Sequence, residues 1–126
     1  MKKVIKIENA PPAVGPYSQA VVFQDIIFIS SQYPIDPLTR EVVGDDIRTQ
    51  TRKVLENLKA IIEASNISIS SVLKCQCYLK NIEDLQAFNE IYADFFGKGH
   101  YPARDLAEVG HLAKGALVSV SAICGR

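Results

Sequence analysis

The chain has 126 residues, of which 48% are hydrophobic, and its 14 lysines and arginines balance 14 aspartates and glutamates. A chain of this length can bury one core, so we predict a single domain over residues 1–126 and exclude intrinsic disorder. The zero net charge argues against a nucleic-acid partner. No apolar run approaches the roughly 20 residues that a membrane helix needs, so we expect no membrane partner either.

The first third of the chain predicts short strands around a long loop. Residues 4–7 are a strand candidate, and residues 8–19 are a loop because proline and glycine interrupt regular structure. Residues 20–30 are apolar and predict two strands that turn near Gln24 and Asp25.

A helix is predicted over residues 46–65, because apolar residues recur at spacings of three and four and form one stripe. Asp45 or Asp46 is placed to cap its first turn. The next segment, residues 71–80, alternates as a half-buried strand does. Its core-facing residues are expected to be Leu73, Cys75, Cys77 and Leu79.

A second helix is predicted over about residues 82–96, with Asn81 as its cap. Two more strands, over about 104–110 and 116–124, complete the predicted elements. The apolar stripe of the second helix consists of Leu85, Phe88, Tyr92, Phe95 and Phe96.

The order of these elements predicts an α+β fold. It is a two-layer sandwich, in which a mixed sheet of about six strands is covered on one face by two helices. The crossover through the first helix is expected to be right-handed. Several residues on the uncovered face are apolar or small, and a closed oligomer would cover them.

The three cysteines and the start of the chain indicate a cytoplasmic protein. Cys75, Cys77 and Cys124 are an odd number, and no apolar secretion signal follows the first lysines. We therefore expect reduced thiols. Their spacing also lacks the paired Cys-x-x-Cys of zinc sites, so no metal is predicted.

Arg104 is the first candidate site residue, because it follows Pro102 at the start of a predicted strand. One interpretation is an ordinary surface arginine, the most common state of this residue type. The other is a guanidinium held at a strand end, where its planar fork of donors binds a carboxylate. Leu106 and Glu108 share its face of the strand by alternation.

Asn89 and Tyr17 are the other unusual positions. Asn89 lies on the apolar side of the second helix, where an amide must find hydrogen-bond partners, either in a neighbouring loop or in a ligand. Tyr17 follows Gly15 and Pro16 in a shaped loop, and is either a packing residue or a phenol in a site. We find no phosphate-binding glycine loop and no serine nucleophile elbow.

Six motifs in one order resemble a known family. They run from about residue 4 to residue 124 and read APPAVGPYSQA, SSQYPIDPLTREVVGDDI, QTRKVLENLKAIIEA, FNEIYADFF, YPAR and KGALV. On these motifs the chain is similar to the RidA/YjgF family of reactive intermediate (enamine/imine) deaminases. The resemblance implies a fold like that of chorismate mutase and a homotrimer with clefts between subunits.

The resemblance also implies a reaction. Members typically hydrolyse 2-iminobutanoate and 2-iminopropanoate to 2-oxo acids and ammonia, without a cofactor or a metal. The carboxylate-binding arginine of the family falls on Arg104, its site tyrosine on Tyr17 and its helix asparagine on Asn89.

Four positions depart from the family pattern. Ser31 replaces a glycine, and Leu106 replaces a cysteine whose backbone carbonyl is thought to help hold the attacking water. Ser119 replaces the water-positioning glutamate, and Ser121 replaces a second common glutamate. The substrate-binding set implied by the resemblance is Ser31, Asn89, Leu106 and Ser119, with Arg104 and Tyr17 as the catalytic pair.

The loss of the glutamate leaves alternatives open. General acid–base help accelerates reactions by roughly 10²–10⁴, and Ser119 cannot accept a proton at neutral pH. One reading is therefore an imine deaminase that is slow or altered. A second is a non-catalytic trimer that binds small carboxylates or has a regulatory role. A third, a ribonuclease role, is disfavoured by the neutral charge.

Overall fold

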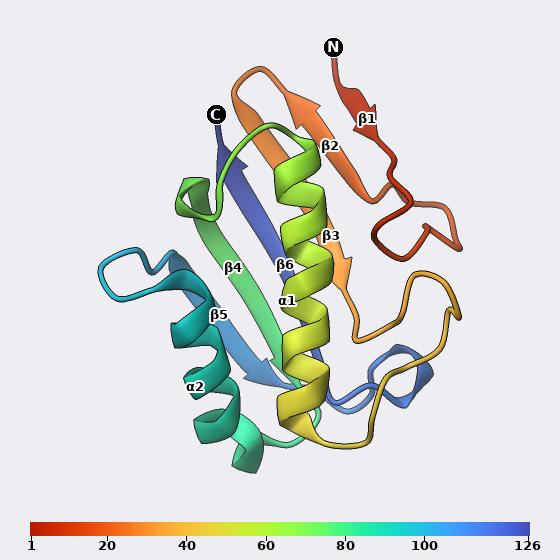
Figure 1. Cartoon of the computed structure of the whole chain (residues 1–126), viewed down its shortest axis with the longest axis vertical. Coiled ribbons are helices and arrows are strands. Elements are labelled where there is room, and N and C mark those ends of the chain that lie inside the picture. The colour runs from red at the N-terminus through yellow and green to blue at the C-terminus, as the bar shows by residue number, and fades with distance from the viewer.

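The computed structural model describes residues 1–126 as two layers, with two helices on one face of a six-stranded sheet (Figure 1). The helices are α1 (Ile47–Ala64) and α2 (Leu85–Phe96). Short 3-10 turns are η1 (Ile69–Ser71), η2 (Ile82–Asp84) and η3 (Ala113–Gly115). The strands are β1 (Lys3–Ile5), β2 (Ala20–Phe23), β3 (Ile26–Gln32), β4 (Val72–Leu79), β5 (Ala103–Glu108) and β6 (Val118–Gly125).

The sheet is mixed, with the strand order β1-β2-β3-β6-β4-β5. Every neighbouring pair is antiparallel except β4 and β5, which run parallel and are joined by the crossover through α2. This arrangement confirms the predicted α+β fold with its helices on one face. Neither helix is long and apolar enough to cross a bilayer.

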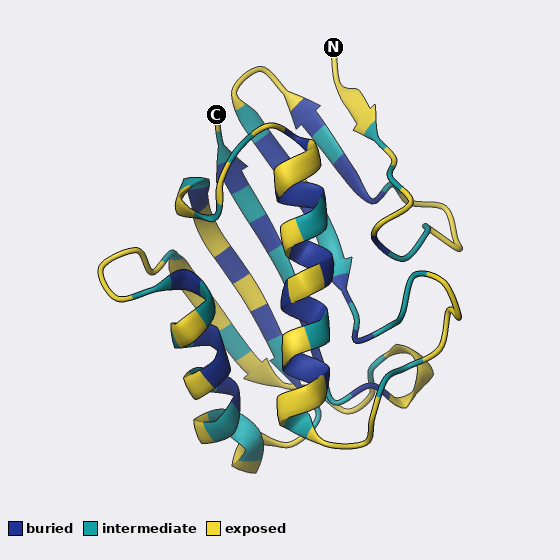
Figure 2. Ribbon diagram, viewed as in Figure 1, coloured by how far each residue is buried: buried dark blue, intermediate teal, exposed yellow.

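The core fills the space between the helices and the sheet, and the buried stripes of α1 and α2 face the strands in Figure 2. Leu58, Ile61 and Ile62 of α1 are fully buried, as is Phe88 of α2. The predicted cap of α1 is confirmed, because Asp46 Oδ2 accepts a hydrogen bond of 2.9 Å from the Thr49 amide.

The predicted strand at 4–7 ends earlier, at Ile5, because a side chain takes over the backbone bonds of Ile7. Gln19 Oε1 accepts the Ile7 amide at 2.7 Å, and Gln19 Nε2 donates to Ile7 O at 3.1 Å. The same amide group donates to the carbonyls of Ala10 and Pro11, so one buried glutamine holds the long loop against β2.

The predicted core face of β4 is wrong at one residue. Leu73 is 52% exposed, whereas Val72 is 5% exposed and lies in the core. The pairing of β4 with β6 shifts register between Val72 and Lys74. Such a bulge adds one residue to one strand, which moves the side chain before it to the opposite face. Beyond the bulge, Cys75 and Cys77 face the core as predicted.

The predicted cap of the second helix is also wrong. The Asn81 side chain makes no capping bond, and the segment begins as the 3-10 turn η2. Glu108 at the end of β5 accepts the Ile82 amide instead, at 2.9 Å. A carboxylate 26 residues away along the chain therefore supplies the acceptor that a local residue was expected to supply.

Asn57→Ala should lower the free energy of unfolding by about 2–3 kcal/mol, because two carbonyls would lose their donor. Asn57 is 1% exposed, and its Nδ2 donates to Tyr33 O and to Ile35 O, both at 2.9 Å. Urea denaturation measures the change. The control is Asn81→Ala, which removes an exposed amide without a capping bond and should change stability by less than about 0.5 kcal/mol. Equal losses in the two variants would contradict the role of Asn57.

Candidate functional site

Arg104 is held by one face of α2. Its Nη1 donates to Asn89 Oδ1 at 2.8 Å. Its Cζ lies 4.9 Å from the centroid of the Tyr92 ring and 5.9 Å from that of Phe88, both within cation–π range. Arg104 forms no ion pair with any carboxylate of the chain. Its charge is therefore positioned and not neutralised.

Local sequence explains how three residues of α2 meet one side chain. Phe88 and Tyr92 are four residues apart and Asn89 lies between them, so all three lie on one side of consecutive turns. The parallel pairing of β4 and β5 places Arg104 opposite Cys75 and beneath this side of α2. Sequence reasoning treated Phe88 and Tyr92 only as core residues. The sequence pattern that could have indicated their contact with Arg104 is the pair Phe88 and Tyr92 on either side of the polar Asn89.

The groups beneath Arg104 are uncharged at neutral pH. Burial raises the pKa of the Cys75 thiol to about 11 and that of the Cys77 thiol to about 12. Burial also raises the pKa of the Tyr92 phenol well above its usual value. The guanidinium of Arg104 therefore lies over protonated, uncharged thiol and phenol groups. No negative charge from these groups repels an anion that approaches it.

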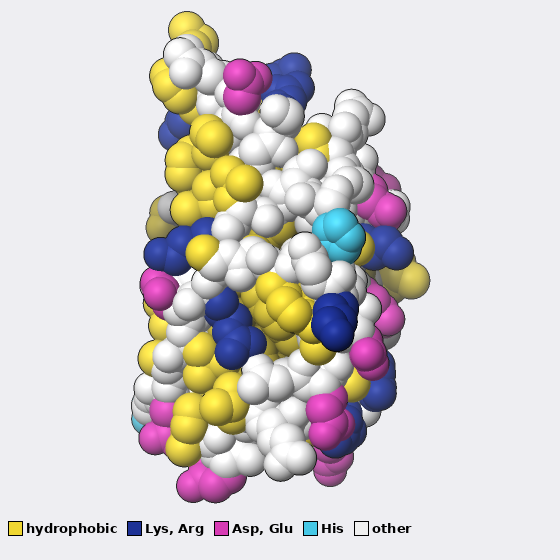
Figure 3. Space-filling model, turned by 90° about the vertical axis from the view of Figure 1, so that its left-hand side faces the viewer, with side chains coloured by type: hydrophobic (Ala, Val, Ile, Leu, Met, Phe, Trp, Pro, Cys, Tyr) yellow, Lys and Arg dark blue, Asp and Glu magenta, His cyan; other side chains and the backbone are white.

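A hollow of about 280 Å³ lies beside this guanidinium. Figure 3 shows the face over α2 and β5, where hydrophobic side chains lie at the bottom of a hollow and basic side chains lie at its rim. The volume is slightly below that of pockets for drug-sized ligands, and it suits a small acid. The lining residues are Asn89, Tyr92, Ala93, Tyr101, Pro102 and Arg104.

Tyr17 lies in the long loop before β2, on the opposite part of the sheet. Its hydroxyl accepts a long bond of 3.4 Å from the Val14 amide, and half of its side chain is exposed. Together with Phe28 and Ser30 it lines a broad hollow of about 590 Å³. Ser31 borders a separate small cavity that Tyr17 also lines.

The chain does not bring these two groups together. Arg104 lies in the edge strand β5, and β6 and β4 lie between it and β3, which carries Ser31. Three interstrand spacings amount to about 14 Å. The two hollows that Tyr17 lines do not include Arg104, and the hollow beside Arg104 does not include Tyr17. A site that used both residues would need a second copy of the chain.

The remaining predicted residues are less exposed. Leu106 is half-buried, shares the face of Arg104 and packs against the core. Ser119 is fully buried, lies opposite Tyr78 of β4, and its hydroxyl has no hydrogen-bond partner within the chain. β6 contains no carboxylate, so no group at this strand can accept a proton from water at neutral pH.

Ser31 lies where the sheet is irregular. The pairing of β3 with β6 shifts register between Ile29 and Gln32, and Ser31 is half-buried in this interval. Ser30 beside it donates to Ser18 O at 2.7 Å, which ties β3 to the end of the long loop. No group of three or more histidine, cysteine, aspartate or glutamate side chains in the chain could hold a metal ion.

Comparison with known proteins gives consistent matches over nearly the whole chain. The family model described as Endoribonuclease L-PSP matches residues 7–125. A RutC family protein of Pyrococcus horikoshii is 50% identical over 123 residues, which cover 98% of this chain and 97% of that protein. The 2-iminobutanoate/2-iminopropanoate deaminase of Salmonella typhimurium is 38% identical over 128 residues, with 100% and 99% coverage.

Solved structures agree with these matches. The crystal structure of E. coli TdcF with bound serine has a TM-score of 0.92 and 35% sequence identity to this chain. The similarity covers 98% of each chain. The ligand in that structure is a small molecule that carries a carboxylate.

Proposed function

Since the chain belongs to the RidA/YjgF (L-PSP, RutC) family, we propose that it is a cytoplasmic enzyme that hydrolyses small 2-imino and enamine acids to 2-oxo acids and ammonia. The observation that carries the proposal is the guanidinium of Arg104, which is held by α2, is unpaired with any carboxylate and borders a hollow of about 280 Å³. A substrate such as 2-iminobutanoate supplies the missing carboxylate.

Arg104 would bind this carboxylate through the N–H groups that Asn89 does not use. A guanidinium has five N–H donors in one plane, and one of its nitrogens donates to Asn89 here. Tyr92 and Phe88 contact the guanidinium as aromatic rings, so they hold it in place without taking up its hydrogen bonds. Binding through a preorganised fork supplies orientation, which is a large part of a bimolecular barrier.

The complete cleft would form between copies in a homotrimer. Tyr17 and Ser31 of one copy would meet Arg104 and Asn89 of the next. Support comes from the separation of the two groups in the single chain and from the uncovered sheet face. On that face, Val4, Val21, Phe28 and Ile123 form one row across four strands by direct cross-strand pairing.

Hydrolysis of the imine consumes one water molecule and needs no other reactant. Water adds to the C=N carbon of the imine, and the carbinolamine that results expels ammonia and leaves a 2-oxo acid. A protonated imine is electrophilic already. The Ser119 hydroxyl and the Leu106 carbonyl would orient the water, and the Tyr17 phenol would donate a hydrogen bond to the bound substrate. No carboxylate on β6 takes the proton, so the reaction is expected to be slow for the family.

Ser119→Glu should raise the rate of 2-iminobutanoate hydrolysis by about 10²-fold, because it adds a proton acceptor where the water is placed. The imine is generated in place by a threonine dehydratase, and its loss is followed by semicarbazide trapping. Ser119→Gln is the matched control, since it adds the same bulk without a base. If the glutamate variant is no faster than the glutamine variant, the attacking water does not lie beside Ser119.

A second function is favoured by one observation, the absence of a carboxylate from β6. The chain would then bind a small 2-oxo acid through Arg104 without turning over the imine. Saturable binding of 2-oxobutanoate, together with imine loss at the spontaneous rate, would establish this function. An RNA-directed activity has less support, because the chain carries no net charge.

A further inference from the structure

The aromatic residues of α2 form a series of ring contacts beside the hollow that Arg104 borders. The ring centroids of Phe88 and Tyr92 lie 5.4 Å apart, and those of Tyr92 and Phe96 lie 4.7 Å apart. Phe95 continues the series, with its centroid 5.0 Å from that of Phe96. These distances are typical of aromatic pairs. Since Tyr92 also lines the hollow, one of its walls is an aromatic ring.

Tyr101 lines the same hollow from the loop between α2 and β5. Gly97 and Gly99 have φ values of 81° and 89°, which allow the chain to turn back after α2 and bring Tyr101 to this place. Tyr101 is 53% exposed and takes part in none of the ring contacts of α2. A single exposed aromatic residue is ordinary, but one that lines a hollow beside an unpaired guanidinium has its ring free for a ligand.

The remaining lining leaves space for a large apolar group. Ala93 is a small side chain, and Pro102 adds a second apolar surface. The volume of about 280 Å³ equals that of roughly nine water molecules in the liquid. With a carboxylate on Arg104, a short aliphatic side chain leaves part of this space without contacts, whereas a phenyl ring fills more of it. Atoms that line an unfilled space lose the dispersion contacts that a ligand would supply.

We propose that this hollow selects 2-imino acids with an aromatic side chain over those with a short aliphatic one. The inference rests on the proposed function, since it takes Arg104 as the group that binds the substrate carboxylate. The ring of the ligand would contact Tyr101, Ala93 and Pro102. Arg104 is the one charged residue of the lining, so an acidic side chain would meet no second cation there.

The test compares two 2-oxo acids, phenylpyruvate and 2-oxobutanoate, which are the products of an aromatic and a short aliphatic imine. Their affinities for the whole native chain are measured by isothermal titration calorimetry, and the rates of loss of the two imines are measured separately. Phenylpyruvate should bind at least about tenfold more tightly, because each methylene-sized group that leaves water improves binding by about fourfold.

Three variants assign this preference to the hollow. Tyr101→Ala should weaken phenylpyruvate binding by about tenfold and 2-oxobutanoate binding by less than about twofold, whereas Tyr101→Phe keeps the ring and should keep the preference. Ala93→Leu places a larger side chain in the hollow, so it should also weaken phenylpyruvate binding by about tenfold and spare 2-oxobutanoate. Leucine is a strong helix former, so α2 is expected to remain intact, and circular dichroism checks this.

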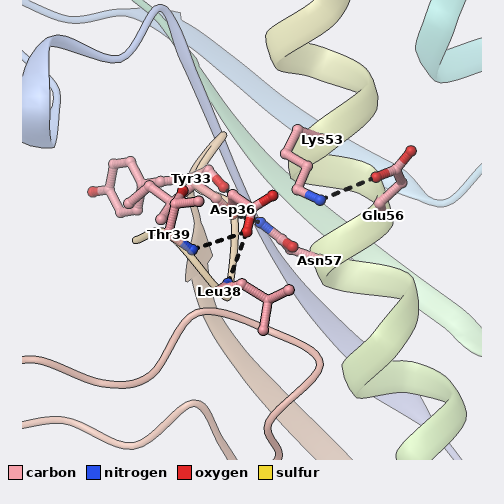
Figure 4. A network of polar contacts seen from close by, with 8 residues as sticks. Tyr33, Asp36, Leu38, Thr39, Lys53, Glu56 and Asn57 are labelled. Carbon is pink, nitrogen blue, oxygen red and sulfur yellow. Dashed lines mark hydrogen bonds and ion pairs between the residues drawn. The ribbon is translucent and has the colours of Figure 1, made fainter. Parts of the chain in front are cut away.

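The control is Leu38→Ala, which removes an exposed apolar side chain from the turn held by the Asp36 carboxylate (Figure 4). That turn follows β3, and β6 and β4 separate β3 from β5, so both affinities should be unchanged. The inference is overturned if the native chain binds the two acids equally, or if Tyr101→Ala weakens both to the same extent.

The rates of imine loss keep this inference apart from the proposed function. Faster loss of 2-iminobutanoate than in buffer, with equal affinities for the two 2-oxo acids, would uphold hydrolysis and overturn the selection. Loss of both imines at the spontaneous rate, with tight binding of phenylpyruvate that depends on Tyr101, would overturn hydrolysis and uphold the selection.

Discussion

Arg104→Ala is expected to lower kcat/KM for 2-iminobutanoate hydrolysis by roughly 10²- to 10⁴-fold. Two charge-assisted hydrogen bonds to a carboxylate contribute about 1.5–3 kcal/mol each, and each 1.4 kcal/mol is a factor of ten. Alanine removes both bonds and the positive charge. The measurement is the semicarbazide-trapping assay over a range of imine concentrations, so that kcat and KM are obtained separately.

Two variants make this result specific to the guanidinium. Arg104→Lys keeps the charge but loses the planar fork, so its rate should lie between those of the native chain and the alanine variant. Arg48→Ala removes an arginine that pairs with Glu90 on the helical face, and it should leave the rate unchanged. A native rate in Arg104→Ala would show that the substrate carboxylate binds elsewhere, and the proposed function would fall with it.

Phe28→Glu is expected to convert the proposed trimer into monomers and to abolish imine hydrolysis. Phe28 is 45% exposed at the middle of the apolar row on the uncovered sheet face. A glutamate there would be buried without a partner in a trimer, which costs several kcal/mol per subunit. Light scattering after size-exclusion chromatography measures the mass, and the same assay measures the rate.

The control for this prediction is Leu38→Glu. Leu38 is 91% exposed in the turn after Asp36, so an added charge there should leave both mass and rate unchanged. Circular dichroism should show that Phe28→Glu remains folded, since its side chain fills no part of the core. If the native chain is a monomer, or if the variant keeps the native mass, the cleft does not form at this sheet face.

Local sequence patterns predicted the elements closely. The first helix was expected over residues 46–65 and spans Ile47–Ala64, and the hairpin turns at Gln24 and Asp25 as expected. These elements follow from the spacing of apolar residues and from turn-forming residues, so the local sequence is enough to specify them. Three details failed because they depend on residues farther along the chain, and one of them is the early end of β1, where Gln19 bonds the backbone of Ile7. The bulge beside Leu73 arises from the register with β6, and η2 is capped by Glu108 of β5.

The candidate site was also predicted only in part, because some of its contacts depend on distant parts of the chain. Arg104 and Asn89 were selected from their positions in the sequence, and the structure joins them by a bond of 2.8 Å. The cation–π contacts of Tyr92 and Phe88 were not foreseen, because they require α2 to lie over β5. The roles of Arg104 and Ser119 are proposals that the variants above test.

The sequence by itself determined the fold class, the family and the residue types available to a site, since these depend on local pattern and on motifs in order. Only the tertiary structure decided which of those residues meet. It brought Arg40 to Lys114 across 74 residues of chain and kept Tyr17 away from Arg104. The physical reason is that strand order and register are set by packing of the whole sheet against its helices, which no short stretch of sequence specifies.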